Sequence, residues 1–163
     1  MSVDQETSLA GILMPQKTCC FPKSVKSMMS WQKSELSYSL IRMAKGDNIA
    51  IAIQLFRNLL SYMTDRKSSK RPVMHARKFL KLCINADDEV KNEAYIQVKK
   101  QLSENPRYDS LLRGWKFLAI LSSVFTPPSN TIYNIIMNYL FFEMQNNTDS
   151  AIVRHAKYIF VRM

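Results

Sequence analysis

The chain has 163 residues, 47% of them hydrophobic, which is enough for one domain with a single sizeable core. Lys and Arg number 23 against 13 Asp and Glu, giving a net charge of +10 and an isoelectric point near 9.7. Only three glycines are present, too few for the tight turns of a β-rich domain, so helices joined by short loops are expected. The positive charge favours an acidic protein, a nucleic acid or an anionic membrane as partner, without choosing among them.

The N-terminal segment lacks a sustained hydrophobic period, so we expect an irregular leader over residues 1–27 that wraps on the domain or is partly disordered. Adjacent Cys19 and Cys20 are interpreted as free thiols near the surface, with acylation as the alternative. Together with Cys83 they form an odd number without metal-binding spacing, which predicts a reduced, intracellular protein. No apolar run reaches the roughly 18–20 residues that a membrane-spanning helix needs.

The domain itself is expected to fill residues 28–163. Residues 27–43 begin with a cluster of apolar residues, and the apolar residues in their second half follow helical spacing. Residues 49–63 have the strongest helical pattern, with a broad apolar stripe. Residues 64–71 form a basic, exposed loop, and a proline then begins a helix over residues 73–84 with apolar and basic residues on opposite faces.

The stretch from Asn92 to Ser129 has the clearest helix start and stop signals in the chain. Helical spacing of apolar residues runs from Val90 to Leu102, and Asn105-Pro106 then interrupts it. Asp109 offers a capping oxygen for a second helix, which Pro127-Pro128 ends. Two amphipathic helices separated by a short turn are therefore predicted here.

Two further helices are expected over residues 131–145 and 150–163, the second with basic side chains facing outward. Together these elements predict an all-α domain, a compact helical bundle of about six to eight helices. An α-solenoid is the alternative, but the sequence shows no fixed repeat period.

A set of residues in the central stretch carries a family resemblance. In chain order they are Glu93, Tyr95, Gln97, Lys100, Gln101, Leu102, Asn105, Pro106, Leu112, Arg113, Gly114, Trp115, Leu118, Phe125, Pro127, Pro128 and Ser129. With this order and spacing they resemble the signature of the myosin tail homology 4 (MyTH4) domain, and the resemblance extends over residues 28–163. Asn92 and Lys99 depart from the family pattern, which usually has an acid and an apolar residue at these positions.

The resemblance implies a non-catalytic binding module of cytoskeletal proteins. Such domains occur in unconventional myosin tails, in a class of plant kinesins and in Rho GTPase-activating proteins, often beside a FERM domain. Residues 27–43 are most similar to the kinesin and GTPase-activating members. The resemblance also implies microtubules or a cargo peptide as partners, and a cytoplasmic, cytoskeleton-associated location. A structural module that supports a neighbouring FERM or Rho GTPase-activating domain is the alternative.

Catalysis and metal binding are not expected. His75 and His155 are far apart in sequence, and neither neighbours a cysteine or a recognisable acidic partner. No paired Cys or His residues have metal-ligand spacing, and no glycine-rich phosphate loop is present. The sequence therefore predicts no enzyme activity, no cofactor and no metal site.

Several residues of the central stretch are expected to have structural roles. We hypothesise that Glu93 and Arg113 form a buried ion pair between two facing helices, with solvent exposure of both as the alternative. Gly114 inside a helix predicts a close approach to a neighbouring helix. Trp115 is expected in the core, and Pro127-Pro128 form a turn rather than a binding site.

The candidate partner-binding residues are basic. They are Arg66, Lys67, Lys70, Arg71, Arg77, Lys78, Lys81, Lys91, Lys99 and Lys100. We interpret them as a patch that docks microtubules or another acidic protein surface, with a generally solvated basic surface as the alternative. Nucleic acid is the less favoured partner because exposed aromatics do not alternate with these basic residues. The sequence leaves membrane binding open.

Overall fold

The computed structural model describes residues 9–15, 17–18, 21–22 and 24–163. Its helices are α2 (Val25–Met29), α3 (Gly46–Tyr62), α4 (Pro72–Ile84), α5 (Asp88–Leu102), α6 (Tyr108–Ser122), α7 (Asn130–Asn146) and α8 (Ser150–Arg162). A helical turn covers residues 9–12, and β1 (Lys17–Thr18) and β2 (Phe21–Pro22) form a two-residue antiparallel ladder. The prediction of an all-α bundle is confirmed. Among the described residues, no helix is both long enough and apolar enough to cross a bilayer.

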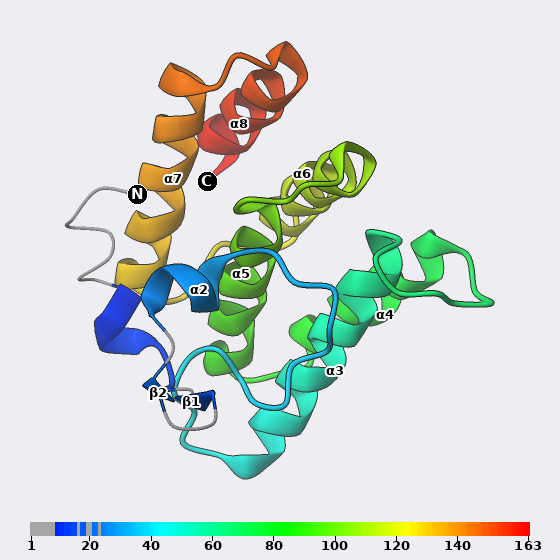
Figure 1. Cartoon of the computed structure of the whole chain (residues 1–163), viewed down its shortest axis with the longest axis vertical. Coiled ribbons are helices and arrows are strands. Elements are labelled where there is room, and N and C mark those ends of the chain that lie inside the picture. Colours follow the sequence, from blue (N-terminus) through cyan, green and yellow to red (C-terminus); the bar gives the residue numbers. More distant parts are fainter. Residues whose placement is uncertain (1–8, 16, 19–20, 23) are drawn as a thin grey trace.

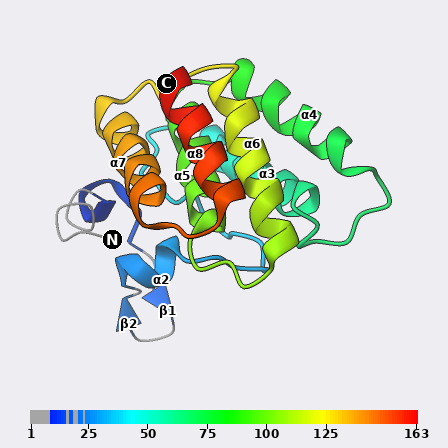
Figure 2. The ribbon, with the colours of Figure 1, turned by 90° about the horizontal axis from the view of Figure 1, so that it is seen from above.

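Helix α5 is the centre of the bundle. It contacts α2, α3, α4, α6 and α7, and both views show α4 and α7 on opposite sides of it (Figures 1 and 2). Every residue from Glu93 to Leu102 is buried, although α5 is rich in polar residues. The helices around α5 therefore bury all of its faces, and its polar side chains need partners inside the protein.

Part of the leader has regular structure: residues 9–12 form a helical turn, and Leu9 and Leu13 are buried in the core. Leu13 also forms an antiparallel bridge to Ile41, which ties this part of the leader to the segment before α3. Residues 9–13 therefore pack against the domain. Cys19 and Cys20 lie outside the described residues.

The helix expected in the second half of residues 27–43 does not form. This segment is irregular from Ser30 onward, although Leu40 and Ile41 are buried as their apolar character suggests. The N–H groups of Leu40 and Ile41 donate to the carboxylate of Glu93 on α5, so a side chain takes the place of helical carbonyls as acceptor. The prediction was wrong because this acceptor lies far away in the sequence.

Gly114 on α6 lies where the chain approaches α5 and the end of α3. A Cβ atom at this position would come within 2.7 Å of Leu102 Cδ2 and 2.9 Å of Met63 Cε. Both distances are shorter than van der Waals contact, so glycine allows the close approach that the sequence predicted. Asp109 does not cap α6 as expected, because the helix begins one residue earlier, at Tyr108.

Candidate docking site

Helix α4 carries a row of exposed cations because its sequence is amphipathic. Pro72 occupies the first helical turn, where its missing N–H costs nothing. Phe79 and Cys83 are fully buried on the inner face. Arg77, Lys78 and Lys81 are exposed on the other faces. The expected division of α4 into apolar and basic faces is therefore present.

The exposed side of α4 also carries apolar side chains that sequence reasoning missed. Val73 is 60% exposed, Met74 39% and Ile84 58%. Val73 and Met74 lie one helical turn before Arg77 and Lys78, so apolar and cationic groups are neighbours on the surface. The sequence contained a sign of this, because Val73, Arg77 and Lys81 are four residues apart and therefore lie on the same side of a helix.

The loop before α4 is attached to the domain through a histidine. His75 is 7% exposed; its Nε2 lies 2.7 Å from Ser68 Oγ, and its Nδ1 lies 3.3 Å from Asn58 Oδ1. Asn58 Nδ2 donates to Gln54 O, which leaves Asn58 Oδ1 as an acceptor for Nδ1–H. The Ser68 hydroxyl then donates to Nε2, and its oxygen accepts the Lys70 N–H. This chain of hydrogen bonds holds the loop against α3 and α4.

The start of the same loop is held by the buried carboxylate of Asp65. Asp65 is 2% exposed and accepts from Trp31 Nε1 at 3.1 Å and from Ser110 Oγ at 2.8 Å. Arg107 Nη1 pairs with the other oxygen at 2.9 Å. These contacts hold the first residues of the loop in place, and the basic residues of the loop come directly after them.

Like charges lie close together between the loop and α4. A hydrogen-bonding contact with Lys70, and then the positive charge of Lys70, lower the pKa of the Lys78 ammonium. Burial lowers the pKa of His75, and the charges of Lys78, Arg66 and Lys70 lower it further. These residues therefore share a positive field that an anionic partner would relieve.

Arg66 differs from the other basic residues of the loop because it already has acidic and polar partners. Its Nε lies 2.7 Å from Glu35 Oε1, and Arg57 Nη2 lies 2.8 Å from Glu35 Oε2. Hydrogen bonding to Arg57 is the main reason that the pKa of Glu35 is lowered. Arg66 thus belongs to an ion-pair network at the edge of the loop rather than to the free cations.

Lys91 also lies in a different setting from the one predicted. Its Nζ is 3.0 Å from Asp88 Oδ1 at the start of α5, where Asp87 and Glu89 add further acidic groups. Acidic residues at a helix N-terminus are favourable, so Lys91 is surrounded by stabilising negative charge. It is not part of the basic surface on α4.

Lys99 and Lys100 were predicted on the basic patch, and that prediction was wrong. Each is 1% exposed inside the bundle. Lys100 Nζ donates to the backbone oxygens of Met28 and Ser30, and so joins α5 to the end of α2. Lys99 Nζ lies 5.0 Å from the centroid of the Tyr139 ring on α7. Helices cover α5 on every side, so these lysines have no exposed face to occupy.

The predicted ion pair between Glu93 and Arg113 is also not formed. Glu93 is fully buried, and its carboxylate accepts from the backbone N–H groups of Leu40 and Ile41 and from Gln97 Nε2, each at 2.8 Å. Arg113 is partly exposed on α6. Two backbone N–H groups and a side-chain amide therefore bind the Glu93 carboxylate, in place of the Arg113 guanidinium that the sequence suggested. Burial raises the pKa of Glu93, and these hydrogen bonds oppose that rise.

The other central residues have the surroundings expected of scaffold residues. Trp115 is 1% exposed and stacks on Tyr139, with ring centroids 5.7 Å apart. Pro127 is buried and Pro128 exposed in the turn between α6 and α7. The thiol of Cys83 is buried, which raises its pKa to about 12 and leaves it unreactive at neutral pH. No group of three or more His, Cys, Asp or Glu residues in the described part of the chain is placed to hold a metal ion.

The remaining cations form one surface, which we call the α4 basic surface. It consists of Lys67, Lys70, Arg71, Arg77, Lys78 and Lys81. All six side chains are exposed, and none forms an ion pair with any residue the structure describes. The arrangement can attract an anionic partner, and it contains no nucleophile or general base placed for catalysis.

The family model for the MyTH4 domain matches residues 76–163, which is more than half of the chain. The chain belongs to the MyTH4 domain family. MyTH4 domains of myosin tails are non-catalytic binding modules. The match begins within α4 and covers α5 to α8, so it includes the central stretch on which the resemblance rested.

Myosins are among the relatives of this MyTH4 domain. It is 36% identical over 115 residues to the high molecular weight form of myosin-1 from Acanthamoeba castellanii, an alignment covering 69% of this chain and 7% of that protein. It is 29% identical over 120 residues to human unconventional myosin-XVB, covering 72% of this chain and 4% of that protein. The chain thus spans a small fraction of these relatives. Both are myosins, whereas residues 27–43 suggested kinesin and Rho GTPase-activating members.

Solved structures of MyTH4-FERM segments share the fold. The MF2 segment of Dictyostelium discoideum myosin VII superposes with a TM-score of 0.85 at 16% identity, covering 99% of this chain and 35% of that one. The C-terminal MyTH4-FERM domain of human myosin 7b, solved with the harmonin-a PDZ3 domain, gives a TM-score of 0.76 at 19% identity, covering 94% and 30%. At these identities the likeness concerns the fold alone.

Proposed function

We propose that this MyTH4 domain docks an acidic protein surface through the α4 basic surface, and that the acidic tails of tubulin on microtubules are that surface. The observation that carries the proposal is the set of six exposed cations without an acidic partner among the described residues. The other basic residues of the predicted patch are paired or buried, so positive potential is concentrated on the loop and α4.

The side chains between these cations favour a protein over a nucleic acid. Val73, Met74 and Ile84 are aliphatic, and they add apolar contact area to an electrostatic encounter. Single-stranded nucleic acids are held by aromatic stacking beside the cations, and the exposed apolar residues of α4 include no aromatic ring.

The parent protein is proposed to be cytoskeletal, as its myosin relatives are. A MyTH4 domain covers about a third of the MyTH4-FERM chains that share its fold, which leaves room for a FERM partner domain in a longer protein. A structural role beside such a domain, with docking of a cargo peptide, is the second candidate. A motor or a Rho GTPase-activating domain elsewhere in the parent would supply any activity.

Cosedimentation with microtubules tests the proposal. We expect binding at about 50 mM salt that falls steeply by about 300 mM, because charges on the two exposed surfaces are screened over a few ångströms at the higher concentration. Microtubules from which a protease has removed the acidic tails serve as the matched control and should bind several-fold less. Equal binding to both kinds of microtubule, or binding that does not respond to salt, would reject the electrostatic proposal.

The structural alternative makes a different prediction. A domain that only supports a FERM neighbour should show no salt-sensitive binding to microtubules, yet should raise the unfolding temperature of that neighbour when the two are joined. Measuring both properties on a MyTH4-FERM segment separates the two candidates.

A further inference from the structure

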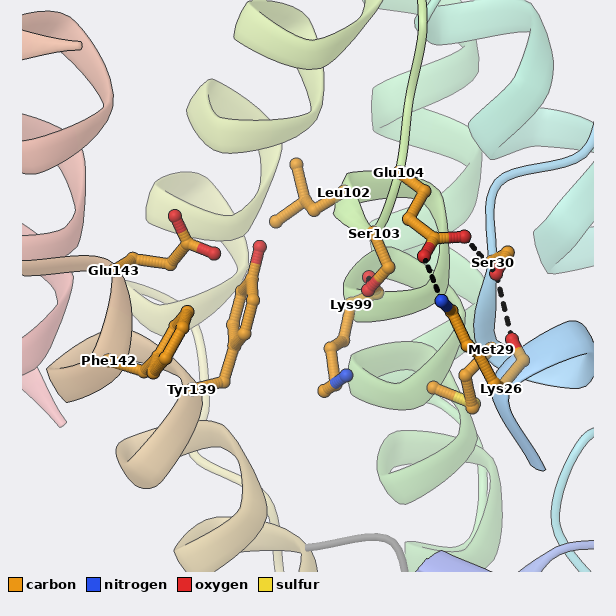
Figure 3. A pocket seen from close by; sticks show the side chains of 10 residues that line it. All are labelled: Lys26, Met29, Ser30, Lys99, Leu102, Ser103, Glu104, Tyr139, Phe142 and Glu143. Carbon is orange, nitrogen blue, oxygen red and sulfur yellow. Dashed lines mark hydrogen bonds and ion pairs between the residues drawn. The ribbon is translucent and has the colours of Figure 1, made fainter. Parts of the chain in front are cut away.

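A second site lies on the other side of α5, between α5, α2 and α7. It is a pocket of about 380 Å³ (Figure 3). Its lining residues are Lys26, Met29, Ser30, Lys99, Leu102, Ser103, Glu104, Tyr139, Phe142 and Glu143. The helices that flank it, α2 and α7, lie away from α4, so this pocket is separate from the α4 basic surface (Figures 1 and 2).

Lys99 is the unusual member of this pocket. Its side chain is 1% exposed, yet its ammonium donates no hydrogen bond to the described residues and faces the ring of Tyr139, 5.0 Å from the centroid (Figure 3). Burial lowers the pKa of Lys99 to about 8, and the negative charge of Glu143 partly opposes this. An ammonium group offers three donors, and a buried one without acceptors is costly to the protein.

The other charged groups of the pocket already have partners. Lys26 Nζ lies 3.1 Å from Glu104 Oε1, and the hydroxyl of Ser30 donates to Glu104 Oε2 at 2.8 Å. Glu143 accepts from Asn147 Nδ2 at 2.6 Å and lies beside the hydroxyl of Tyr139. Among the described residues that line the pocket, Lys99 is therefore the one charged side chain without a hydrogen-bond partner, and Glu143 is the nearby group of opposite charge that acts on it.

Part of the wall around Lys99 is apolar. Met29 from α2 and Leu102 from α5 are buried, and Phe142 on α7 is 49% exposed at the rim. A volume of this size holds one or two side chains rather than a bare ion. The complementary ligand combines a negative charge with an apolar group.

We propose that this pocket binds a carboxylate carried on an apolar segment of a partner protein, with Lys99 as the group that pairs with the carboxylate. An incoming carboxylate would give the ammonium the acceptors that it lacks, in a setting where a charged hydrogen bond is strong. Met29, Leu102 and Phe142 would contact the apolar part of the segment. This site is independent of the proposed microtubule docking, because it shares no residue with the α4 basic surface.

Matched peptides test the proposal on the intact chain. The probes are acetyl-phenylalanine with a free carboxylate and acetyl-Phe-Glu-Phe-amide, which separate a C-terminal carboxylate from a side-chain carboxylate as the source. Their neutral controls are acetyl-phenylalanine amide and acetyl-Phe-Gln-Phe-amide. The NMR signal of the Lys99 Cε, followed during titration, reports binding at this residue and the midpoint of its own protonation.

We expect at least one acidic probe to bind about tenfold or more tighter than its neutral control and to raise the protonation midpoint of Lys99. Lys99→Met should abolish this preference, whereas Lys81→Met, an exposed lysine on the α4 basic surface, should leave it unchanged. Equal binding of the acidic and neutral probes to the wild-type chain would overturn the proposal, as would the absence of any saturable shift at Lys99. The wild-type comparison decides the question even if Lys99→Met does not fold.

Discussion

Helices α4 and α5 are both rich in cations, but their lysines have opposite surroundings. On α4, Lys78 and Lys81 are exposed and unpaired among the described residues. On α5, Lys99 and Lys100 are 1% exposed in the centre of the bundle. The difference comes from position in the bundle, because α4 is covered on one side whereas α5 contacts five other helices. A cluster of basic residues in a sequence therefore predicts a surface only when the helix that carries it has a free face.

Among the buried polar residues of α5, Glu93 should contribute most to the stability of the domain. The two carboxylate oxygens of Glu93 each accept one backbone N–H group, and in Glu93→Gln one of these oxygens becomes an amide nitrogen, which cannot accept, so one buried N–H loses its partner. We expect the free energy of unfolding to fall by roughly 3 kcal/mol, the scale of unsatisfied buried donors. Denaturant unfolding monitored by circular dichroism measures it.

Asp88→Asn is the matched control for that change, because Asp88 is an exposed acid of the same helix whose ion pair joins it to Lys91. It should alter stability by less than about 1 kcal/mol. Similar losses in the two variants would show that Glu93 has no special role.

Lys99 should oppose folding, in contrast to Glu93. Lys99→Met keeps the volume of the side chain and removes an ammonium whose pKa is lowered to about 8 by burial. A shift of this size corresponds to roughly 3 kcal/mol, from which the lost cation–π contact with Tyr139 subtracts about 1 kcal/mol. We therefore expect the free energy of unfolding at pH 7 to rise by about 2 kcal/mol.

The same variant should also change the response to pH. In the wild-type chain the folded state holds fewer protons on Lys99 than the unfolded state, so stability should rise between pH 8 and about 10. That rise should be smaller in Lys99→Met, while Lys81→Met should behave as the wild type. A destabilised Lys99→Met variant at pH 7 would contradict the account.

A smaller effect of the same sign is expected at His75, beside the α4 basic surface. Burial and the charges of Lys78, Arg66 and Lys70 place the pKa of His75 below its ordinary value of 6.5. As the pH falls through the unfolded value, the unfolded chain binds more protons, so the free energy of unfolding decreases. We expect His75→Gln to lose less stability than the wild type between pH 7 and pH 5.

His155→Gln is the control for this measurement, because the Nδ1 of His155 contacts only the Ala151 carbonyl of its own helix among the described residues. Unfolding curves at several pH values give the slopes. If both variants reduce the slope equally, His75 is not the source of the effect.

Much of the fold could be predicted from the sequence because it follows from local patterns. The helices from α3 to α8 have clear apolar periodicity and punctuation, and the outward position of Arg77, Lys78 and Lys81 follows from the same pattern. The close approach at Gly114 could be predicted because glycine inside a helix is otherwise costly.

The main failures involve contacts between residues distant in sequence. The segment around Leu40 and Ile41 is irregular because Glu93 binds its backbone from α5. Lys99 and Lys100 are buried because α2 and α7 cover α5, which the pattern of α5 alone does not show. Lys99 gave one usable sign, since it replaces the apolar residue that the family usually has at this position.

The most direct test compares two triple charge reversals, on different faces of this domain, in the cosedimentation assay at low salt. Lys70→Glu, Lys78→Glu and Lys81→Glu together change the α4 basic surface, whereas Arg154→Glu, Lys157→Glu and Arg162→Glu make the same change in net charge on exposed positions of α8. We expect a loss of microtubule affinity of about tenfold or more for the first variant and of less than about threefold for the second. Equal losses in both variants would show that net charge, and not the α4 basic surface, determines binding.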